Sequence, residues 1–237
     1  MSIWTRIFEL AGGAAASDAI ARIIEAIRTV LEGDPETRRK VAFSVAMIAL
    51  SAKMAKADGI VTIDEVRAFR DIFAIPPEEE ANVARLYDLA KKDIAGYEFY
   101  ASRLASLCGS GNRNCLLLED ILDGLFHIAK VDGAVHEAEL RFLTSIASIF
   151  DIEEEHFERI MARHVHTGGF DPYKVLGVSR ETDMAEIKRI YHRAVAQNHP
   201  DRLLARGVPE EFLTIATDRT AKLNAAYEEI EKDRIAA

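Results

Sequence analysis

The stretch that decides the fold of the C-terminal part covers residues 183–201 and runs D-M-A-E-I-K-R-I-Y-H-R-A-V-A-Q-N-H-P-D. Asp183 is a favoured helix N-cap, and Glu186 three residues later is typical of a capping box. Pro200 disfavours helical geometry for the residue before it, so the helix must end at His199. The apolar side chains between these signals return at helical spacing and share one face: Ile187, Ile190, Tyr191 and Ala194.

The charges of this predicted helix have one sign. From Ile187 to Asn198 there are three positive charges and no negative one, and they lie largely off the apolar face: Lys188, Arg189 and Arg193. We therefore expect an exposed basic face that leads into a His-Pro-Asp turn.

The flanking residues complete a helical hairpin. Asp171 and Pro172 form a helix start, with Asp as N-cap and Pro at the first helical position, and Gly177 ends this short helix. A further helix is predicted from about Pro209, with its apolar positions at Phe212, Leu223, Tyr227 and Ile230. Two antiparallel helices joined by such a turn form a hairpin, which places the basic face and the turn on one exposed edge.

The N-terminal part contains an internal repeat. Residues 55–67 align with residues 129–141, and both copies contain a Lys-x-Asp-Gly turn between two apolar helical patterns. Two such helix-turn-helix units would bury their faces against each other as a pseudo-symmetric bundle. Strand signals are missing throughout, so the chain is predicted to be all-α. Residues 1–35 form an amphipathic segment, for which we favour packing over insertion of Trp4 and Phe8 into a membrane interface.

The repeated turn is similar to the second half of a calcium-binding loop, but it lacks the oxygen ligands of the first half. No metal site is therefore expected, and a structural turn with a left-handed Gly is favoured. Three histidines near residue 160 are expected to be exposed at a domain end: His156, His164 and His166. The carboxylates that remain as weak metal candidates are Asp58, Glu65, Asp132 and Glu139.

Composition excludes several classes of protein. The net charge of −9 argues against nonspecific nucleic-acid binding, which depends on neutralising phosphates. Cys108 and Cys115 cannot form a disulfide framework; two free thiols in a reducing compartment are expected, with a bridge closing the intervening loop as the alternative. No stretch reaches the roughly 20 apolar residues of a membrane span, and a secretory signal is not evident. A cytoplasmic protein is expected.

Two resemblances extend this interpretation. Four segments in the correct order, D-P-Y-K-V-L-G-V, E-I-K-R-I-Y-H-R, H-P-D-R and L-N-A-A-Y-E-E-I, resemble the J domain of the DnaJ family. The paired Lys-x-Asp-Gly turns resemble the TerB-like domain, and the loop at residues 203–210 resembles the DjlA branch, which joins these two domains. The expected division is a segment at 1–35, a TerB-like helical bundle at 36–166 and a J-domain hairpin at 171–237.

The resemblance implies a function. A J domain binds the nucleotide-binding domain of an Hsp70 (DnaK) and stimulates its ATP hydrolysis, which makes this chain a co-chaperone with a role in stress response and not an enzyme, and implies no cofactor. Asp201 would accept hydrogen bonds from an Hsp70 arginine. The residues that the resemblance assigns to Hsp70 binding are Lys188, Arg189, His192, Arg193, His199, Pro200, Asp201 and Arg202.

The TerB-like part is expected to select an unknown client or adaptor, or to determine location. The alternative is a metal-responsive or tellurite-stress module whose J domain recruits Hsp70. Two departures from the usual J-domain pattern are Ala194, where Leu is usual, and Gln197, where a basic residue is usual. Known DjlA proteins begin with a membrane span that this chain lacks, so membrane contact is expected to be peripheral at most, at the inner membrane.

Overall fold

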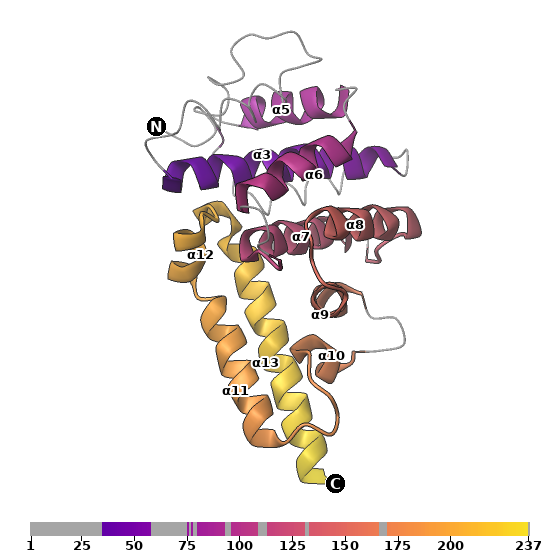
Figure 1. Cartoon of the computed structure of the whole chain (residues 1–237), viewed down its shortest axis with the longest axis vertical. Coiled ribbons are helices and arrows are strands. Elements are labelled where there is room, and N and C mark those ends of the chain that lie inside the picture. The colour runs from indigo at the N-terminus through magenta and orange to yellow at the C-terminus, as the bar shows by residue number, and fades with distance from the viewer. Residues whose placement is uncertain are drawn as a thin grey trace.

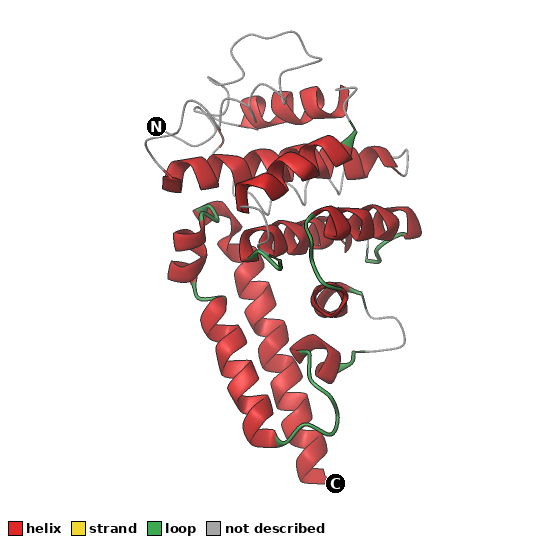
Figure 2. Cartoon of the chain, viewed as in Figure 1, coloured by secondary structure: helices red, strands yellow, loops and turns green. Residues whose placement is uncertain are grey.

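The computed structural model describes residues 35–57, 75, 77, 80–92, 96–108, 113–130, 133–165 and 170–236. Within these ranges the chain forms helices joined by loops and turns, with no strand (Figure 2). The prediction of an all-α protein is confirmed. The N-terminal segment with Trp4 and Phe8 lies outside the described residues, as do Asp58, Glu65 and Asp132.

The N-terminal helical bundle is built around α3 (Pro35–Ala57). The residues of this helix from Val41 to Ala55 are all buried. A helix that is mostly apolar on all its faces must be covered on every side. Its neighbours are α5 (Glu80–Lys92), α6 (Tyr97–Ala105), α7 (Leu116–Ala129) and α8 (Glu137–Ile149). Its buried Ser51 hydroxyl donates to the carbonyl oxygen of Met47 at 2.5 Å, which satisfies a polar group inside the core.

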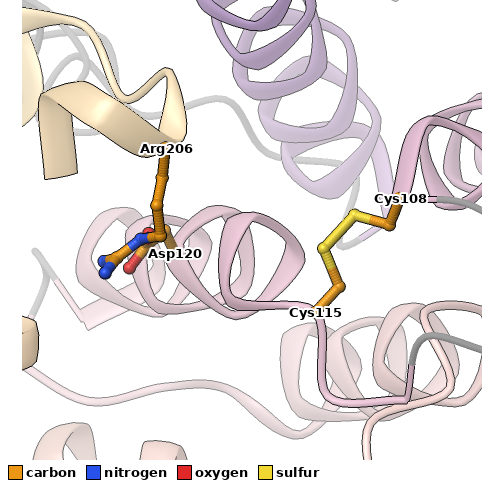
Figure 3. Close-up of a disulfide and its surroundings, with 4 residues drawn as sticks. All are labelled: Cys108, Cys115, Asp120 and Arg206. Atoms are coloured by element: carbon orange, nitrogen blue, oxygen red, sulfur yellow. A yellow bond between two sulfur atoms is a disulfide. The ribbon is translucent and has the colours of Figure 1, made fainter. Parts of the chain in front are cut away.

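A disulfide between Cys108 and Cys115 joins the end of α6 to the start of α7, so the expectation of two free thiols is wrong. Cys108 ends a short 3-10 turn, η2 (Ser106–Cys108), and Cys115 is the N-cap residue of α7. Because α6 and α7 both pack on α3, the Cα atoms of the two cysteines are 6.3 Å apart, within bonding range. Figure 3 shows the bridge at one end of α7 and Asp120 farther along the same helix.

The second copy of the repeat joins α7 to α8. Gly133 has a φ of +94°, so the prediction of a left-handed glycine at this turn is confirmed. The carboxylate of Glu139 accepts a hydrogen bond from the backbone amide of His136 at 2.8 Å and thereby caps the start of α8. A further helix, α9 (Glu154–His164), follows and packs on α7.

The C-terminal part is a hairpin of two long helices, α11 (Met184–Gln197) and α13 (Leu213–Ala236), flanked by the short helix α10 (Pro172–Leu176) (Figure 1). Asp171 caps α10 by accepting from the amide of Tyr173, and Gly177 ends it with a φ of +65°. The predicted hairpin is confirmed. Its core includes Ile187, Leu223 and Ile230, and the stacked rings of Tyr191 and Tyr227 lie 4.3 Å apart.

One helix of this part is absent from the sequence prediction. Residues 200–206 form α12 (Pro200–Arg206), where a loop was expected. The helix α11 ends at Gln197 with Asn198 as its C-cap, and His199 is the N-cap of α12, because its extended backbone precedes a proline at the first helical position. The chain then passes through a 3-10 turn, η4 (Glu210–Phe212), into α13, which begins four residues later than the predicted start near Pro209.

The largest apolar core extends into the C-terminal part. Side chains from α12, the loop after it, η4 and the start of α13 belong to the same buried cluster as α3 and α7: Leu203, Val208, Phe212, Ile215 and Ala216. The rings of Phe43 and Phe212 meet edge to face at 4.5 Å. At Gly124 a Cβ atom would lie 2.9 Å from the Met47 Cε atom, so a larger residue there would require the end of the Met47 side chain to shift.

The shared core predicts that the two parts unfold together. Substitution of Phe212 by Ala should lower the free energy of unfolding by about 3–5 kcal/mol, because it removes a buried ring that contacts α3. Urea unfolding followed by circular dichroism should show one transition at a lower midpoint, with faster amide exchange in α7. Ile235→Ala, at a side chain that is 87% exposed, is the control. Two transitions of which only one shifts would contradict a shared core.

Candidate functional site

The basic face predicted for α11 is exposed to solvent. Lys188, Arg189, His192 and Arg193 all lie on the outside of the hairpin. Asp183 caps α11 by accepting from the amide of Glu186 at 2.9 Å, but the predicted capping box is only half formed. The carboxylate of Glu186 accepts instead from Arg189 Nε at 2.8 Å, since the two side chains are three residues apart on the helix surface.

The His-Pro-Asp turn stands at the end of this face. The side chain of Asp201 is 87% exposed and that of His199 is 61% exposed. The imidazole Nδ1 of His199 accepts from the backbone amide of Asp201 at 3.3 Å and lies 3.6 Å from its carboxylate. Pro200 fixes the backbone between them. The turn therefore presents one carboxylate to solvent, and the neighbouring Arg202 is exposed as well.

The base of the turn is buried, in contrast to its tip. Asn198 directly precedes His199 and is 9% exposed. Its amide group donates to the carbonyl oxygen of Ala194 at 2.8 Å and accepts from Arg219 Nη1 at 2.8 Å. Arg206 Nη1 donates to the carbonyl oxygen of Gln197 at 2.9 Å. Two guanidinium groups thus hold the last turn of α11.

These two guanidinium groups are held in turn by carboxylates of α7. Asp120 accepts from Arg219 Nη1 at 2.8 Å and from Arg206 Nη2 at 2.9 Å (Figure 3 shows Arg206 directed at Asp120). Asp123 accepts two bonds from Arg219, through Nε at 3.0 Å and Nη2 at 2.9 Å. The side chains of Asp120 and Asp123 are 5% and 1% exposed. The hydrogen bonds are therefore shielded from water, and they join α7 to the turn.

The second carboxylate oxygen of Asp123 accepts hydrogen bonds from two residues of α9. Arg163 donates to it through Nε at 3.1 Å and Nη2 at 2.8 Å, and His164 Nε2 lies 3.1 Å away. Burial alone would raise the pKa of the Asp123 carboxyl, but Arg219, Arg163 and His164 outweigh it and hold this pKa well below its usual value. Asp123 is therefore ionised wherever the protein is folded at ordinary pH.

His164 is neutral inside this cluster. Burial lowers the pKa of its imidazole to about 4, although Asp123 opposes the shift. Its ring stacks on Phe126 at 5.5 Å, and the residue is 8% exposed. The expectation of an exposed histidine is wrong for His164, because α9 directs it into the core. His156 is half-buried and lies 3.0 Å from Glu119, and His166 falls outside the described residues.

The residues that hold the turn are not predicted from the sequence: Asp120, Asp123, Arg206 and Arg219. One feature of the sequence does indicate buried ion pairs. Residues 116–129 of α7 are otherwise mostly apolar and carry two aspartates three positions apart, which places both carboxylates on one face. Such a pair in a buried helix requires cationic partners, but the sequence does not say which of many arginines supply them.

The weak metal candidates gain no support. Glu139 is 2% exposed and serves as a helix cap, as described above. Among the residues that the structure describes, no three His, Cys, Asp or Glu side chains gather so that they could hold a metal ion. The other three candidates lie outside those residues. None of the described helices has the length and apolar character needed to cross a membrane.

Comparison with protein families agrees with this architecture. Residues 44–162 match the model of the tellurite resistance protein TerB, and residues 171–234 match the model of the DnaJ domain. The fold and site thus define a J-domain protein with a helical bundle in front. The chain belongs to the DjlA-like type of this family, with a TerB-like domain followed by a J domain.

Several curated relatives share both parts. The co-chaperone protein DjlA of Photobacterium profundum is 29% identical over 222 residues, which cover 83% of this chain and 79% of the relative. DjlA of Coxiella burnetii is 29% identical over 76% of this chain and 73% of its own length. DjlA of Photorhabdus laumondii is 31% identical over 50% of this chain and 52% of its own length. No solved structure matches the chain significantly.

The neutral His164 predicts a pH dependence of stability. Its pKa falls from 6.5 to about 4 on folding, so between these values the unfolded chain binds a proton that the folded chain does not. Stability must therefore fall as the pH drops through this window, by up to about 3 kcal/mol from this group. Groups that face the imidazole are Asp123, Arg163 and Lys222.

Urea unfolding at pH 7 and near pH 4.5 measures this effect. His164→Gln keeps a donor for Asp123 but cannot titrate, so it should lose less stability on acidification than the wild type. His192→Gln, which removes an exposed imidazole, should behave as the wild type does. An equal loss in the wild type and His164→Gln would show that His164 does not carry the pH dependence.

Proposed function

We propose that this chain is a co-chaperone that binds the nucleotide-binding domain of an Hsp70 (DnaK) through its J domain and stimulates ATP hydrolysis. The observation that carries the proposal is the solvent-exposed Asp201 carboxylate at the end of a basic helix. The curated relatives, whose printed names describe them as co-chaperone proteins, support it. The chemistry belongs to Hsp70, so the chain itself is not an enzyme in this account.

The tip of the turn is suited to one strong contact. An exposed carboxylate accepts charge-assisted hydrogen bonds, and a guanidinium donor can supply two in parallel. Because Asp201 forms no hydrogen bond through its carboxylate within the described part of the chain, both oxygens are available to a partner. Pro200 and the hydrogen bond from the Asp201 amide to His199 fix the backbone that carries this side chain, so little backbone entropy is lost on binding.

The basic face would guide the encounter. Lys188, His192, Arg193 and Arg202 are exposed and form no ion pair within the described residues, whereas Arg189 shares its charge with Glu186. Rim charges of this kind mainly accelerate association and set the register of docking. A cationic surface selects an acidic one, which on this proposal is a surface of Hsp70. Binding then favours the Hsp70 conformation that hydrolyses ATP, since a ligand shifts an equilibrium by its differential affinity.

The TerB-like part would have a different task. We propose the division at 36–166 and 171–237, with the TerB-like part as the client, adaptor or localisation module. The ion pairs from α7 fix the base of the turn to this part, so a client held there would stand in a defined place relative to Hsp70. The proposed location is the cytoplasm, with any contact to the inner membrane peripheral.

Steady-state ATP hydrolysis by the cognate Hsp70 tests the role of Asp201. Asp201→Asn keeps the shape of the side chain but removes its charge. A charge-assisted hydrogen bond is worth about 1.5–3 kcal/mol, so stimulation should fall by at least about tenfold. Asp233→Asn, at an exposed carboxylate on α13, should stimulate as well as the wild type. Equal stimulation by Asp201→Asn and the wild type would falsify the assigned role.

A further inference from the structure

A cleft of about 470 Å³ lies between the TerB-like part and the J-domain hairpin. One wall comes from α7 and α9, and the other comes from α11. At its far end the cleft reaches Gln197 and Asn198, the two residues that precede the His-Pro-Asp turn. The cleft therefore opens beside the surface proposed to bind Hsp70.

The floor of this cleft is apolar and its walls are cationic. Val175, Leu176 and Leu223 are buried at the floor, and Leu116 is 39% exposed. Arginines contribute most of the charge: Arg159 and Arg163 from α9, Arg189 and Arg193 from α11, Arg206 from α12 and Arg219 from α13. A partner that fits must bring an apolar side chain together with a negative charge.

Most of these arginines form ion pairs within the protein. Arg163, Arg206 and Arg219 bind Asp120 and Asp123, and Arg189 binds Glu186. Arg159 and Arg193 differ, because neither forms a hydrogen bond or an ion pair with any of the described residues. One belongs to the TerB-like part and the other to the J domain, so they face one cleft from its two sides.

Arg159 packs closely against Gly177 of the J domain. A Cβ atom on Gly177 would lie 2.1 Å from the Arg159 Cδ atom. Gly177 has a φ of +65°, a conformation that glycine adopts without strain. The absence of a side chain there lets the aliphatic stem of Arg159 lie against the J domain, and Arg159 lines the cleft.

Three carboxylates also line the cleft, and Glu186 lies close enough to Arg193 for the arginine to help lower its pKa, but none of the three forms an ion pair with Arg159 or Arg193 within the described residues. Glu119 lies 3.0 Å from His156, and Glu186 is bound by Arg189. Six arginines against three carboxylates leave the lining of the cleft with an excess of positive charge, which attracts an anion. Guanidinium groups favour carboxylates through paired hydrogen bonds.

We propose that Hsp70 docks across this cleft, with an acidic segment of its surface held between Arg193 and Arg159 and an apolar side chain on the floor. The TerB-like part would then form part of the Hsp70-binding site. This inference rests on the proposed function. Hsp70 is the occupant that the geometry favours, because α11 carries both one wall of the cleft and the basic face beside the turn.

Charge reversal at Arg159 tests the inference in the full chain. Arg159→Glu should raise the concentration needed for half-maximal stimulation of the Hsp70 ATPase by about threefold to tenfold, with maximal stimulation unchanged, because rim charges act on association. The double variant with Arg193→Glu should raise this concentration by less than the product of the two single fold increases, because both arginines would hold the same segment. Higher salt should reduce the difference from the wild type.

The matched control is Lys92→Glu, the same charge change on an exposed residue of α5. That helix lies on the far side of α3 from α9 (Figure 1). Circular dichroism should show the same thermal midpoint for Arg159→Glu and the control. If Arg159→Glu stimulates as Lys92→Glu does, or lowers only the maximum, the cleft is not an Hsp70 contact. If Asp201→Asn loses stimulation in the same ATPase assay, the proposed function stands even though the cleft contact fails. If Asp201→Asn stimulates as the wild type does, the proposed function and the cleft contact are both contradicted.

Discussion

The ion pairs between Asp123 and Asp120 of α7 and Arg219 of α13 are the interaction on which the arrangement of this protein depends. The side chains lie almost out of contact with water, and five hydrogen bonds from Arg219 and Arg206 reach the two carboxylates. Burying such charges is costly, and the cost is offset only because each oxygen finds a donor. Removal of one partner would leave an uncompensated buried charge and cost about 3–5 kcal/mol.

The network explains why an exposed turn can have a fixed orientation. The tip of the turn, at Asp201, is open to solvent, whereas its base at Asn198 is bound to Arg219, and the preceding carbonyl group is bound to Arg206. Apolar packing supports the same junction, since Phe212 meets Phe43 of α3. Apolar contacts alone are not directional, and the ion pairs supply the direction. The J-domain hairpin is therefore an extension of the helical bundle.

The sequence predicts those features that depend on neighbouring residues. The caps at Asp171 and Asp183, the break at His199 and the exposed side of α11 all follow from local rules and are present. Features that depend on distant residues were missed. The burial of His164 and the pairing of Asp120 with Arg206 join positions 40 or more residues apart. The disulfide also depended on how α6 and α7 pack against α3, which the sequence does not reveal. The helix α12 is not evident from the sequence because Pro200 indicates the end of one helix and suits the start of another equally well.

Amide hydrogen exchange of the full-length chain with Asp120→Asn tests this account most directly. The substitution weakens the hold on Arg206 and Arg219 without changing the shape of the side chain. If α7 fixes the turn, exchange should become faster at the amides of Asn198 and His199, although they lie on another part of the chain. Exchange at Ile187 to Arg189, at the other end of α11, should increase less than at these two amides. Unchanged exchange at Asn198 and His199 would contradict the claim that α7 holds the turn in place.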